Sequence, residues 1–396
     1  MLIAMSSAAA FESLVAQLPA GSAAAWRDPS ESGVLRIFGV KDALPVFSLT
    51  KMFIAAAILR LMDAGALRVT DKIAKFLPGA PGHGSIKAVL NHTAGLGDYA
   101  HTPAYLRAVH EQPDQPWDLR QIASISSTGI PGSFAYSNTG YWLLGALLES
   151  LLAEPLHLVL EREVFTPLGM VSTRYPLPET SLSPTGYSTL WAGPAGAAFS
   201  TPSDVLRFQA ILQSTTGVSG DYLSVAAREL LFSCVAVDAQ APWRAPKYAM
   251  GIMVDPALRL WGHGGSGPGY QSAAFSSLAT GVGASIICPS SGTLNPEAIL
   301  IKHLGVQERL VVHLEPAHGR RWPLWDPASG REIDPHRLGL DPELIADLRS
   351  WAEGWESGHS DQHGWISKKS RLGFEAQRLV LLASLRERAG GYLLVL

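Results

Sequence analysis

Hydrophobic and polar positions divide the first three quarters of the chain into three stretches. An N-terminal helical pattern leads into two strand-like runs at 23–27 and 33–40, and apolar helical patterns dominate from 48 to about 235. A β-rich stretch follows, with runs at Tyr248–Val254, Leu258–Gly262, Tyr270–Ser277 and Gly281–Pro289. A last helix is predicted from Asn295-Pro296-Glu297 to His303. This order predicts a sheet built from both ends of the segment, with a helical subdomain inserted between them.

The pattern changes near residue 305. Charged residues number 40 among residues 1–304 but 25 among the 92 residues that follow, and this tail also holds five of the eleven tryptophans. We therefore predict a domain at 1–304, a linker at 305–321 and a small Trp-rich α/β appendage at 322–396. Within the appendage we expect a helix starting at Asp341-Pro342-Glu343, a second at 373–388 closed by Gly390-Gly391, and a short strand at 392–396.

Composition narrows the class of protein. The net charge is only −3 and there is no basic run, so we expect no nucleic-acid partner. No stretch reaches the roughly 20 apolar residues of a membrane span, and the N-terminus lacks the basic region of a signal peptide, so we expect a cytoplasmic protein. Cys234 and Cys288 suit buried apolar positions rather than a disulfide framework or a zinc site. No cluster has metal-ligand spacing, and we expect neither a metal nor a cofactor.

The first chemical motif is Ser48-Leu49-Thr50-Lys51, which opens a helix that is apolar on every side. Residues three apart lie on the same helix face. A helix without a polar face is buried, so the Lys51 ammonium should be poorly solvated and its pKa lowered, which suits a base. A serine hydroxyl becomes a useful nucleophile when such a base takes its proton. Alone, the Ser-x-x-Lys pattern also fits an N-cap serine beside a solvated lysine.

Two further motifs carry groups that complement this pair. Tyr136-Ser137-Asn138 precedes an apolar helix, where a phenol can relay a proton and an amide can both donate and accept hydrogen bonds. The third motif, Trp261-Gly262-His263-Gly264-Gly265-Ser266-Gly267, lies at the end of a predicted strand. His263 can titrate near neutral pH, and the glycines allow a substrate close to the backbone, where a free N–H can complete an oxyanion hole. Separately, each motif also fits helix capping or a tight turn.

Together and in this order, the motifs resemble those of the serine β-lactamase and penicillin-recognising superfamily, in particular its class C-like branch of β-lactamases, D-alanyl-D-alanine carboxypeptidases, D-aminopeptidases and esterases. Residues 47–78, 90–96, 165–170 and 199–204 also read like landmarks of that branch. The resemblance covers residues 10–304. It implies an α+β fold of the β-lactamase/transpeptidase type, with an antiparallel sheet flanked by helices and an inserted helical subdomain. The tail lies outside it and looks like a small bacterial domain of unassigned role.

The resemblance also implies roles for individual residues. Ser48 would be the acylated nucleophile, Lys51 its base and Tyr136 the proton shuttle. Asn138 would contact a substrate amide, and His263 would occupy the place of the Lys/His-Thr-Gly motif, with Gly264 and Gly265 along the substrate. The oxyanion hole would consist of the backbone N–H groups of Ser48 and Ser266.

The chain departs from the family pattern at the third motif, where His-Gly-Gly replaces Lys-Thr-Gly. Because that lysine attracts substrate carboxylates, its absence favours an esterase, amidase or D-amino-acid peptidase over a β-lactamase. We therefore expect a small acyl substrate, an acyl-Ser48 intermediate and transfer to water. Two alternatives stay open. One is a cytoplasmic transacylase of natural-product biosynthesis that uses an amine or alcohol acceptor, and the other is an inactive binding or sensor protein. The sequence does not predict an oligomeric state.

An α/β-hydrolase is the nearest enzymatic rival, because His263-Gly264-Gly265-Ser266-Gly267 resembles a lipase-type oxyanion loop. The Gly-x-Ser-x-Gly elbow that such an enzyme needs downstream is missing. The same glycines match no phosphate-binding or dinucleotide fingerprint. The resemblance to the class C-like branch therefore accounts for more of the chain than an α/β-hydrolase would.

Overall fold

The structure, a computed structural model, describes residues 6–395 apart from 32–33, 80–83, 127, 214–221, 239–241, 291–293, 306–309, 328–329, 339, 361–363 and 389–392. The chain forms two compact units. Unit 1 comprises residues 1–231, 248–253 and 260–305, and unit 2 comprises residues 232–247, 254–259 and 306–396.

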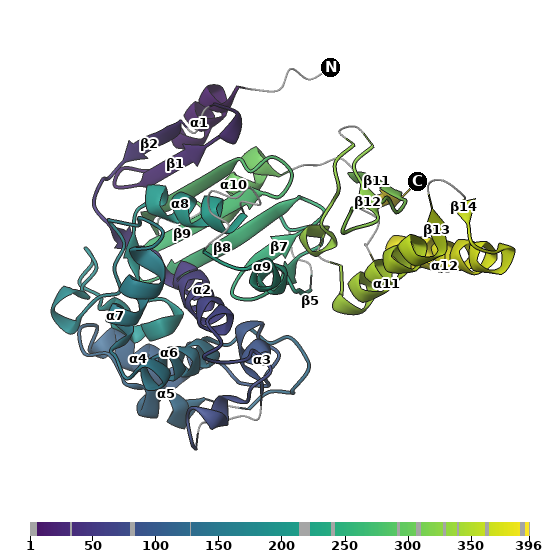
Figure 1. The fold of residues 1–396 in the computed structure, drawn as a ribbon. Helices are drawn as coiled ribbons and strands as arrows, with labels where there is room; N and C mark the ends of the chain where they lie inside the picture. The colour runs from purple at the N-terminus through teal and green to yellow at the C-terminus, as the bar shows by residue number, and fades with distance from the viewer. Residues whose placement is uncertain are drawn as a thin grey trace. The chain divides into compact units, whose positions relative to one another are not determined.

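An eight-stranded sheet has the strand order β2-β1-β10-β9-β8-β7-β6-β5. Its strands are β1 (Ala23–Arg27), β2 (Leu35–Gly39), β5 (Val235–Ala236), β6 (Lys247–Tyr248), β7 (Met253–Asp255), β8 (Leu260–Gly267), β9 (Tyr270–Ser277) and β10 (Gly283–Pro289). β1 pairs antiparallel with both β2 and β10, and the β8-β9-β10 run is antiparallel throughout. The N-terminal strands thus join the late strands, as the order of the sequence patterns predicts (Figure 1).

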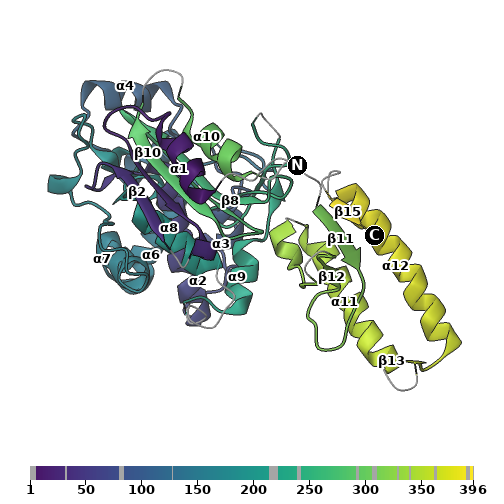
Figure 2. The ribbon, with the colours of Figure 1, turned by 90° about the horizontal axis from the view of Figure 1, so that it is seen from above.

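Helices cover both faces of this sheet. α1 (Ser7–Val15) and α10 (Pro296–Leu304) pack together, with α10 on β9 and β10, whereas α8 (Pro202–Gln213) packs on β1, β9 and β10 from the other face (Figure 2). The N-cap side chain of Asn295 accepts from the Ala298 N–H, which fixes where α10 begins. This end of the helix lies beside the cavity described below.

The inserted helical subdomain extends below the sheet in Figure 1. Its helices are α3 (Ile86–Leu90), α4 (Pro103–Glu111), α5 (Leu119–Ile125), α6 (Asn138–Leu152) and α7 (Leu156–Leu160). Between subdomain and sheet lies α2 (Thr50–Asp63), in which nearly every side chain is buried, as its uniformly apolar sequence predicts. Among the described helices none could cross a membrane alone, and only the bent pair Asn138–Leu152 and Leu156–Phe165 has the required length and composition.

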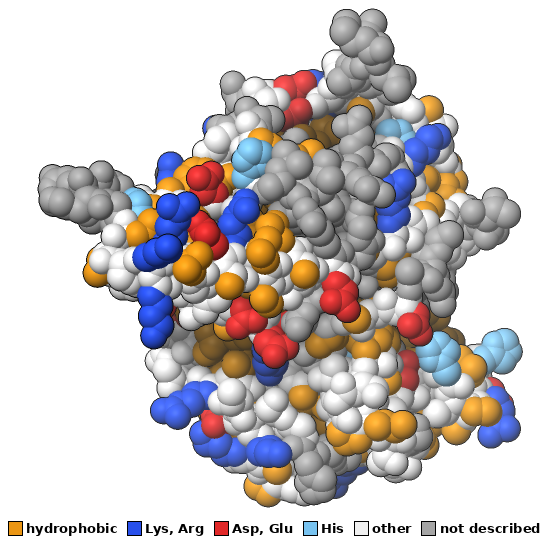
Figure 3. Space-filling view, turned by 90° about the vertical axis from the view of Figure 1, so that its right-hand side faces the viewer, with side chains coloured by type: hydrophobic (Ala, Val, Ile, Leu, Met, Phe, Trp, Pro, Cys, Tyr) orange, Lys and Arg blue, Asp and Glu red, His pale blue; other side chains and the backbone are white. Residues whose placement is uncertain are grey.

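Unit 2 contains a three-stranded sheet in the order β12-β11-β15 and two long helices. β11 (Leu310–Leu314) pairs antiparallel with β12 (Leu324–Trp325) and parallel with β15 (Leu393–Val395). α11 (Pro342–Gly358) begins at the Asp341 N-cap, as predicted, and α12 spans Lys368–Arg388. Trp322 and Trp351 lie in the apolar core of this unit. Figure 3 shows basic, acidic and apolar side chains interspersed on one face of the molecule.

The unit boundary differs from the predicted one. The predicted linker at 305–321 contains β11, so unit 2 begins near residue 306 rather than 322. Unit 2 also includes two earlier segments, and Ala257 from one of them packs in its apolar core. A change in composition marks a domain boundary only where the domain is one uninterrupted stretch of sequence. Unit 2 consists of three separate stretches, so composition did not reveal the two earlier ones. The predicted helix end at Gly390-Gly391 lies outside the described residues.

Candidate active site

Ser48 lies in a tight 3-10 turn, Phe47–Leu49, that leads directly into α2. Lys51 lies in the first turn of α2, three residues after Ser48 and on the same face, and its Nζ lies 3.1 Å from Ser48 Oγ. Phe47, just before the serine, has a φ of 45°, in the left-handed region that non-glycine residues rarely occupy. Backbone strain of this kind costs on the order of 1–3 kcal/mol and persists only where surrounding structure enforces it. The predicted Ser48–Lys51 pairing is therefore present.

Lys51 is fully buried, and its Nζ has two further polar neighbours. It donates to Asn138 Oδ1 at 2.7 Å and to the Ala195 carbonyl at 2.8 Å. Burial lowers the pKa of Lys51 to about 7, against an opposing attraction to Asp98. A neutral amine has two N–H groups and one lone pair. With both N–H groups bound to these acceptors, the lone pair is left for the Ser48 hydroxyl. The lowered pKa predicted from the sequence is confirmed.

Asp98 orients the amide of Asn138 and was not predicted from the sequence. The Asn138 side-chain nitrogen donates to both Asp98 carboxylate oxygens at 3.1 Å, and its backbone N–H donates to the same carboxylate at 3.2 Å. The amide oxygen therefore faces Lys51. Asn138 also lines the cavity, where a substrate could reach it. In the sequence, Asp98 is a single acid in a loop, and nothing marks it as a partner of a residue 40 positions later.

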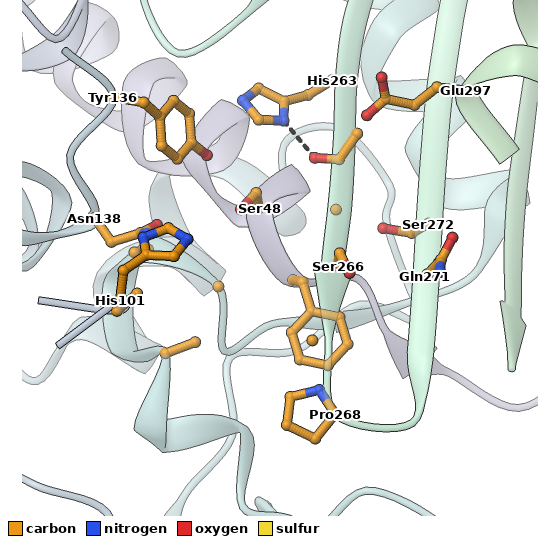
Figure 4. Close-up of a pocket in the computed structure, with 18 of the residues that line it drawn as sticks. Ser48, His101, Tyr136, Asn138, His263, Ser266, Pro268, Gln271, Ser272 and Glu297 are labelled. Carbon is orange, nitrogen blue, oxygen red and sulfur yellow. Dashed lines mark hydrogen bonds between the residues drawn. The ribbon is translucent and has the colours of Figure 1, made fainter. Parts of the chain in front are cut away.

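Tyr136 points its phenol oxygen toward Ser48 (Figure 4). Burial raises the pKa of Tyr136 well above its usual value, partly offset by a hydrogen bond with Ser48. The phenol is therefore protonated near neutral pH. Its ring packs 4.3 Å from the ring of His92, whose Nδ1 accepts from the Ser137 N–H at 3.1 Å. His92 thus positions the loop that carries Tyr136 and leads into α6 at Asn138, a role that the sequence motifs did not indicate.

All seven residues of the third motif belong to strand β8 (Leu260–Gly267). β8 extends through Gly267, past the predicted end at Gly262. A methyl group at Gly267 would overlap the Phe47 ring, and one at Gly265 would overlap the Val46 carbonyl and lie 3.1 Å from the Ser48 nitrogen. Because these positions lack side chains, the strand can run against the nucleophile turn. This brings Ser266 to the same cavity wall as Ser48, as a shared oxyanion hole requires.

His263 lines the cavity. The sequence predicted that it titrates near neutral pH, and this prediction is wrong. Burial lowers its pKa to about 3, and the nearby Lys51 charge adds to the effect. The ring nitrogens are both engaged, Nδ1 with the Gly264 carbonyl and Nε2 with the Tyr248 hydroxyl at 2.9 Å. Since the carbonyl can only accept, Nδ1 carries the proton and Nε2 accepts from Tyr248. His263 is therefore a neutral side chain held in place by Tyr248. The sequence motifs gave no sign of this role for Tyr248.

These groups converge on one cavity of about 850 Å³ in unit 1. Ser48, Tyr136, Asn138, His263, Gly264, Gly265 and Ser266 all line it. Lys51 lies behind them in the core. Such a volume suits a small organic molecule. Among the described residues no group of His, Cys, Asp or Glu side chains could hold a metal ion. The cavity thus presents a serine hydroxyl in contact with a buried amine, and a protonated phenol beside it, which are groups that could carry out acyl transfer.

The glycine contacts give a first prediction. We expect Gly265→Ala to lower kcat/KM for a small ester about 10²-fold, because the added methyl must push β8 away from the Ser48 turn and displacements of about 1 Å have such effects. Steady-state kinetics would measure this. Gly129→Ala is the matched control, since its nearest contact would be an ordinary 3.6 Å. Equal rates in the two variants would contradict the close approach of β8.

Comparison with known proteins places this site in a family context. Residues 14–303 match the sequence model of the family described as Beta-lactamase. Residues 311–395 match the one described as Serratia CdiI immunity protein-like. Penicillin-binding protein 4* of Bacillus subtilis is 29% identical over 271 residues, which cover 57% of this chain and 56% of that protein. The carboxypeptidase/endopeptidase AmpH of Escherichia coli is 30% identical over 188 residues, or 41% and 47% of the two chains. This chain thus spans about half the length of these curated relatives.

Solved structures agree in fold. A D-stereospecific amidohydrolase from Streptomyces sp. has a TM-score of 0.61 and 25% identity over 74% of this chain and 95% of that one. The D-amino acid amidase of Ochrobactrum anthropi SV3, complexed with D-phenylalanine, has a TM-score of 0.61 and 20% identity over 74% and 97%, which supports the fold alone. The match over residues 14–303 confirms the resemblance and the α+β fold expected from the sequence. The chain belongs to the Beta-lactamase family.

Proposed function

We propose that this protein hydrolyses a small ester or amide through an acyl intermediate on Ser48. The observation that carries the proposal is the contact between Ser48 and a buried lysine whose pKa is about 7. A lysine that is half deprotonated near neutral pH is close to the optimum for a general base. The cavity of about 850 Å³ beside it offers room for the substrate.

Acylation would begin with transfer of the Ser48 hydroxyl proton to Lys51 Nζ as Oγ attacks the substrate carbonyl carbon. The backbone N–H groups of Ser48 and Ser266 would stabilise the negative charge on the carbonyl oxygen. Tyr136, protonated near neutral pH, would give its proton to the leaving alcohol or amine and regain one from Lys51. The bond to the leaving group breaks, and the acyl group stays on Ser48.

Deacylation would repeat these steps with water as the nucleophile. Lys51 takes a proton from water, the oxygen attacks the acyl carbon, and Ser48 Oγ leaves with a proton. Neutral His263 would act as a wall of the cavity that positions β8, not as an acid or base at neutral pH. An amine or alcohol that replaced water would yield the transacylation expected as an alternative from the sequence.

The relatives support the choice of substrate class. Among the similar proteins are a D-alanyl-D-alanine carboxypeptidase/endopeptidase and a D-stereospecific amidohydrolase. Each of these names describes cleavage of an amide or peptide bond. We therefore place the substrate of this chain among small esters, amides and D-amino-acid peptides.

Intact-protein mass spectrometry tests the proposal directly. The protein is mixed with p-nitrophenyl butyrate, and mass and product are followed with time. We expect an adduct of one butyryl group that decays as free butyrate accumulates. Added amines or alcohols then show whether the acyl group can be diverted from water. An adduct that never decays would identify a sensor instead of an enzyme, and the absence of both adduct and product would contradict the proposal.

A further inference from the structure

The charge of the cavity wall is unusual for a site that would recognise a carboxylate. Of the described residues that line the cavity, none is a lysine or arginine, and Glu297 is the only acid. The nearby Asp98 is not among them and is hydrogen-bonded to Asn138. A substrate carboxylate would thus meet a negative wall, whereas a cation would meet an opposite charge.

Glu297 is held in place by its position in the fold. It lies in the first turn of α10, where the helix dipole favours an ionised carboxylate. Its Oε1 occupies the space that a side chain at Gly264 would take, so the carboxylate packs directly on β8. The side chain is half-buried, so its interactions with a ligand would be screened less than those at an open surface.

The orientation of the site assigns Glu297 to one side of the scissile bond. Figure 4 shows Glu297 and Asn138 on opposite sides of Ser48. The resemblance to the family assigns Asn138 to a substrate amide. We take this amide to belong to the acyl part of the substrate, which places Glu297, on the other side of Ser48, beside the leaving group.

We propose that Glu297 binds a cationic ammonium group on the leaving alcohol, thiol or amine of the substrate. The substrate class would then be amino-alcohol esters, amino-thiol thioesters or amides of diamines and basic amines, with carboxylate-bearing leaving groups disfavoured. This inference rests on the proposed acyl transfer through Ser48 and names its specificity.

A matched set of thioesters tests it. Butyrylthiocholine carries a quaternary ammonium on the leaving thiol, and 3,3-dimethylbutyl thiobutyrate is its neutral carbon isostere. We expect wild type to favour the cation at least tenfold in kcat/KM, as expected for an interaction with a charged partner, mainly through a lower KM. In Glu297→Gln this ratio should fall to about one, and in Glu297→Lys the S-butyryl ester of 3-mercaptopropionate should be preferred over butyrylthiocholine. Glu12→Gln, an exposed acid on α1, removes the same charge away from the cavity and should keep the wild-type ratio.

The outcomes separate this inference from the function on which it rests. If no thioester acylates Ser48 in wild type, the proposed function fails. If the neutral thioester is hydrolysed but the cationic preference is absent, or persists in Glu297→Gln, the ammonium site is refuted while the function stands. A thioester with trimethylammonium on its acyl part and ethanethiol as leaving group completes the set. A preference for this probe that disappears in Glu297→Gln would refute the placement beside the leaving group.

Discussion

Ser48→Ala is expected to reduce hydrolysis of p-nitrophenyl butyrate at least about 10³-fold, to near the background rate. Nucleophile and base act as a unit in serine hydrolases, and loss of the nucleophile removes the covalent route altogether. The Lys51 amine would remain buried behind the cavity without the hydroxyl it faces at 3.1 Å. Initial rates at saturating ester, together with the intact mass, would measure the effect.

Ser272→Ala is the matched control, because Ser272 lines the same cavity. Its hydroxyl donates to the Val46 carbonyl at 2.7 Å, so it supports the turn before Ser48 and is not directed at Lys51. This variant should still form the acyl adduct. An adduct retained in Ser48→Ala, or lost only in Ser272→Ala, would mean that the nucleophile has been misassigned.

The activity of the wild-type protein is expected to rise with pH through about 7. Below the pKa of Lys51 the ammonium has no lone pair for the Ser48 proton, and above it the amine is free to act. Neither His263 nor Tyr136 should add a second limb between about pH 5 and 9. His263, with a pKa of about 3, stays neutral there, and the raised pKa keeps Tyr136 protonated. The measurement is kcat/KM for a neutral ester from pH 5 to 9.

Variants link this profile to Lys51. Lys51→Ala should lower kcat/KM about as severely as loss of Ser48. Asp98→Asn should move the rising limb to lower pH, because the Asp98 charge favours the ammonium form and raises the pKa of Lys51. A profile that is flat between pH 6 and 8, or one that Asp98→Asn moves upward, would rule out Lys51 as the general base.

Sequence patterns predicted those parts of the fold that depend on residues close to one another in the sequence. The strands β1 and β9 have the predicted ends, and α10 begins where its Asn-Pro signal predicts. The pKa of Lys51 also follows from the apolar helix around it. The full length of β8 could not be predicted, since its glycines resemble a turn and only their contacts with Val46 and Phe47 explain them.

Residues whose roles depend on distant contacts were beyond prediction. The sequence gives Asp98 no link to Asn138. The neutral state of His263 depends on burial and on the Lys51 charge, and the ring is held by Tyr248, 15 positions earlier. Glu297 looks like an ordinary acid in a first helical turn. Its place opposite Asn138 in the cavity becomes visible only once β8 and α10 are packed together.

The path of the chain through unit 2 limits how this unit could be exchanged for another domain. The chain passes between the units at five places, after residues 231, 247, 253, 259 and 305. Simple end-to-end joining of two genes would create one junction. Here the segment with Ala257 completes the apolar core of unit 2 from within the sequence of its neighbour. Exchanging the part of unit 2 after residue 305 for another domain would therefore also require compensating changes at 232–247 and 254–259. Substitutions in these two segments and in the C-terminal part of unit 2 are thus expected to depend on one another.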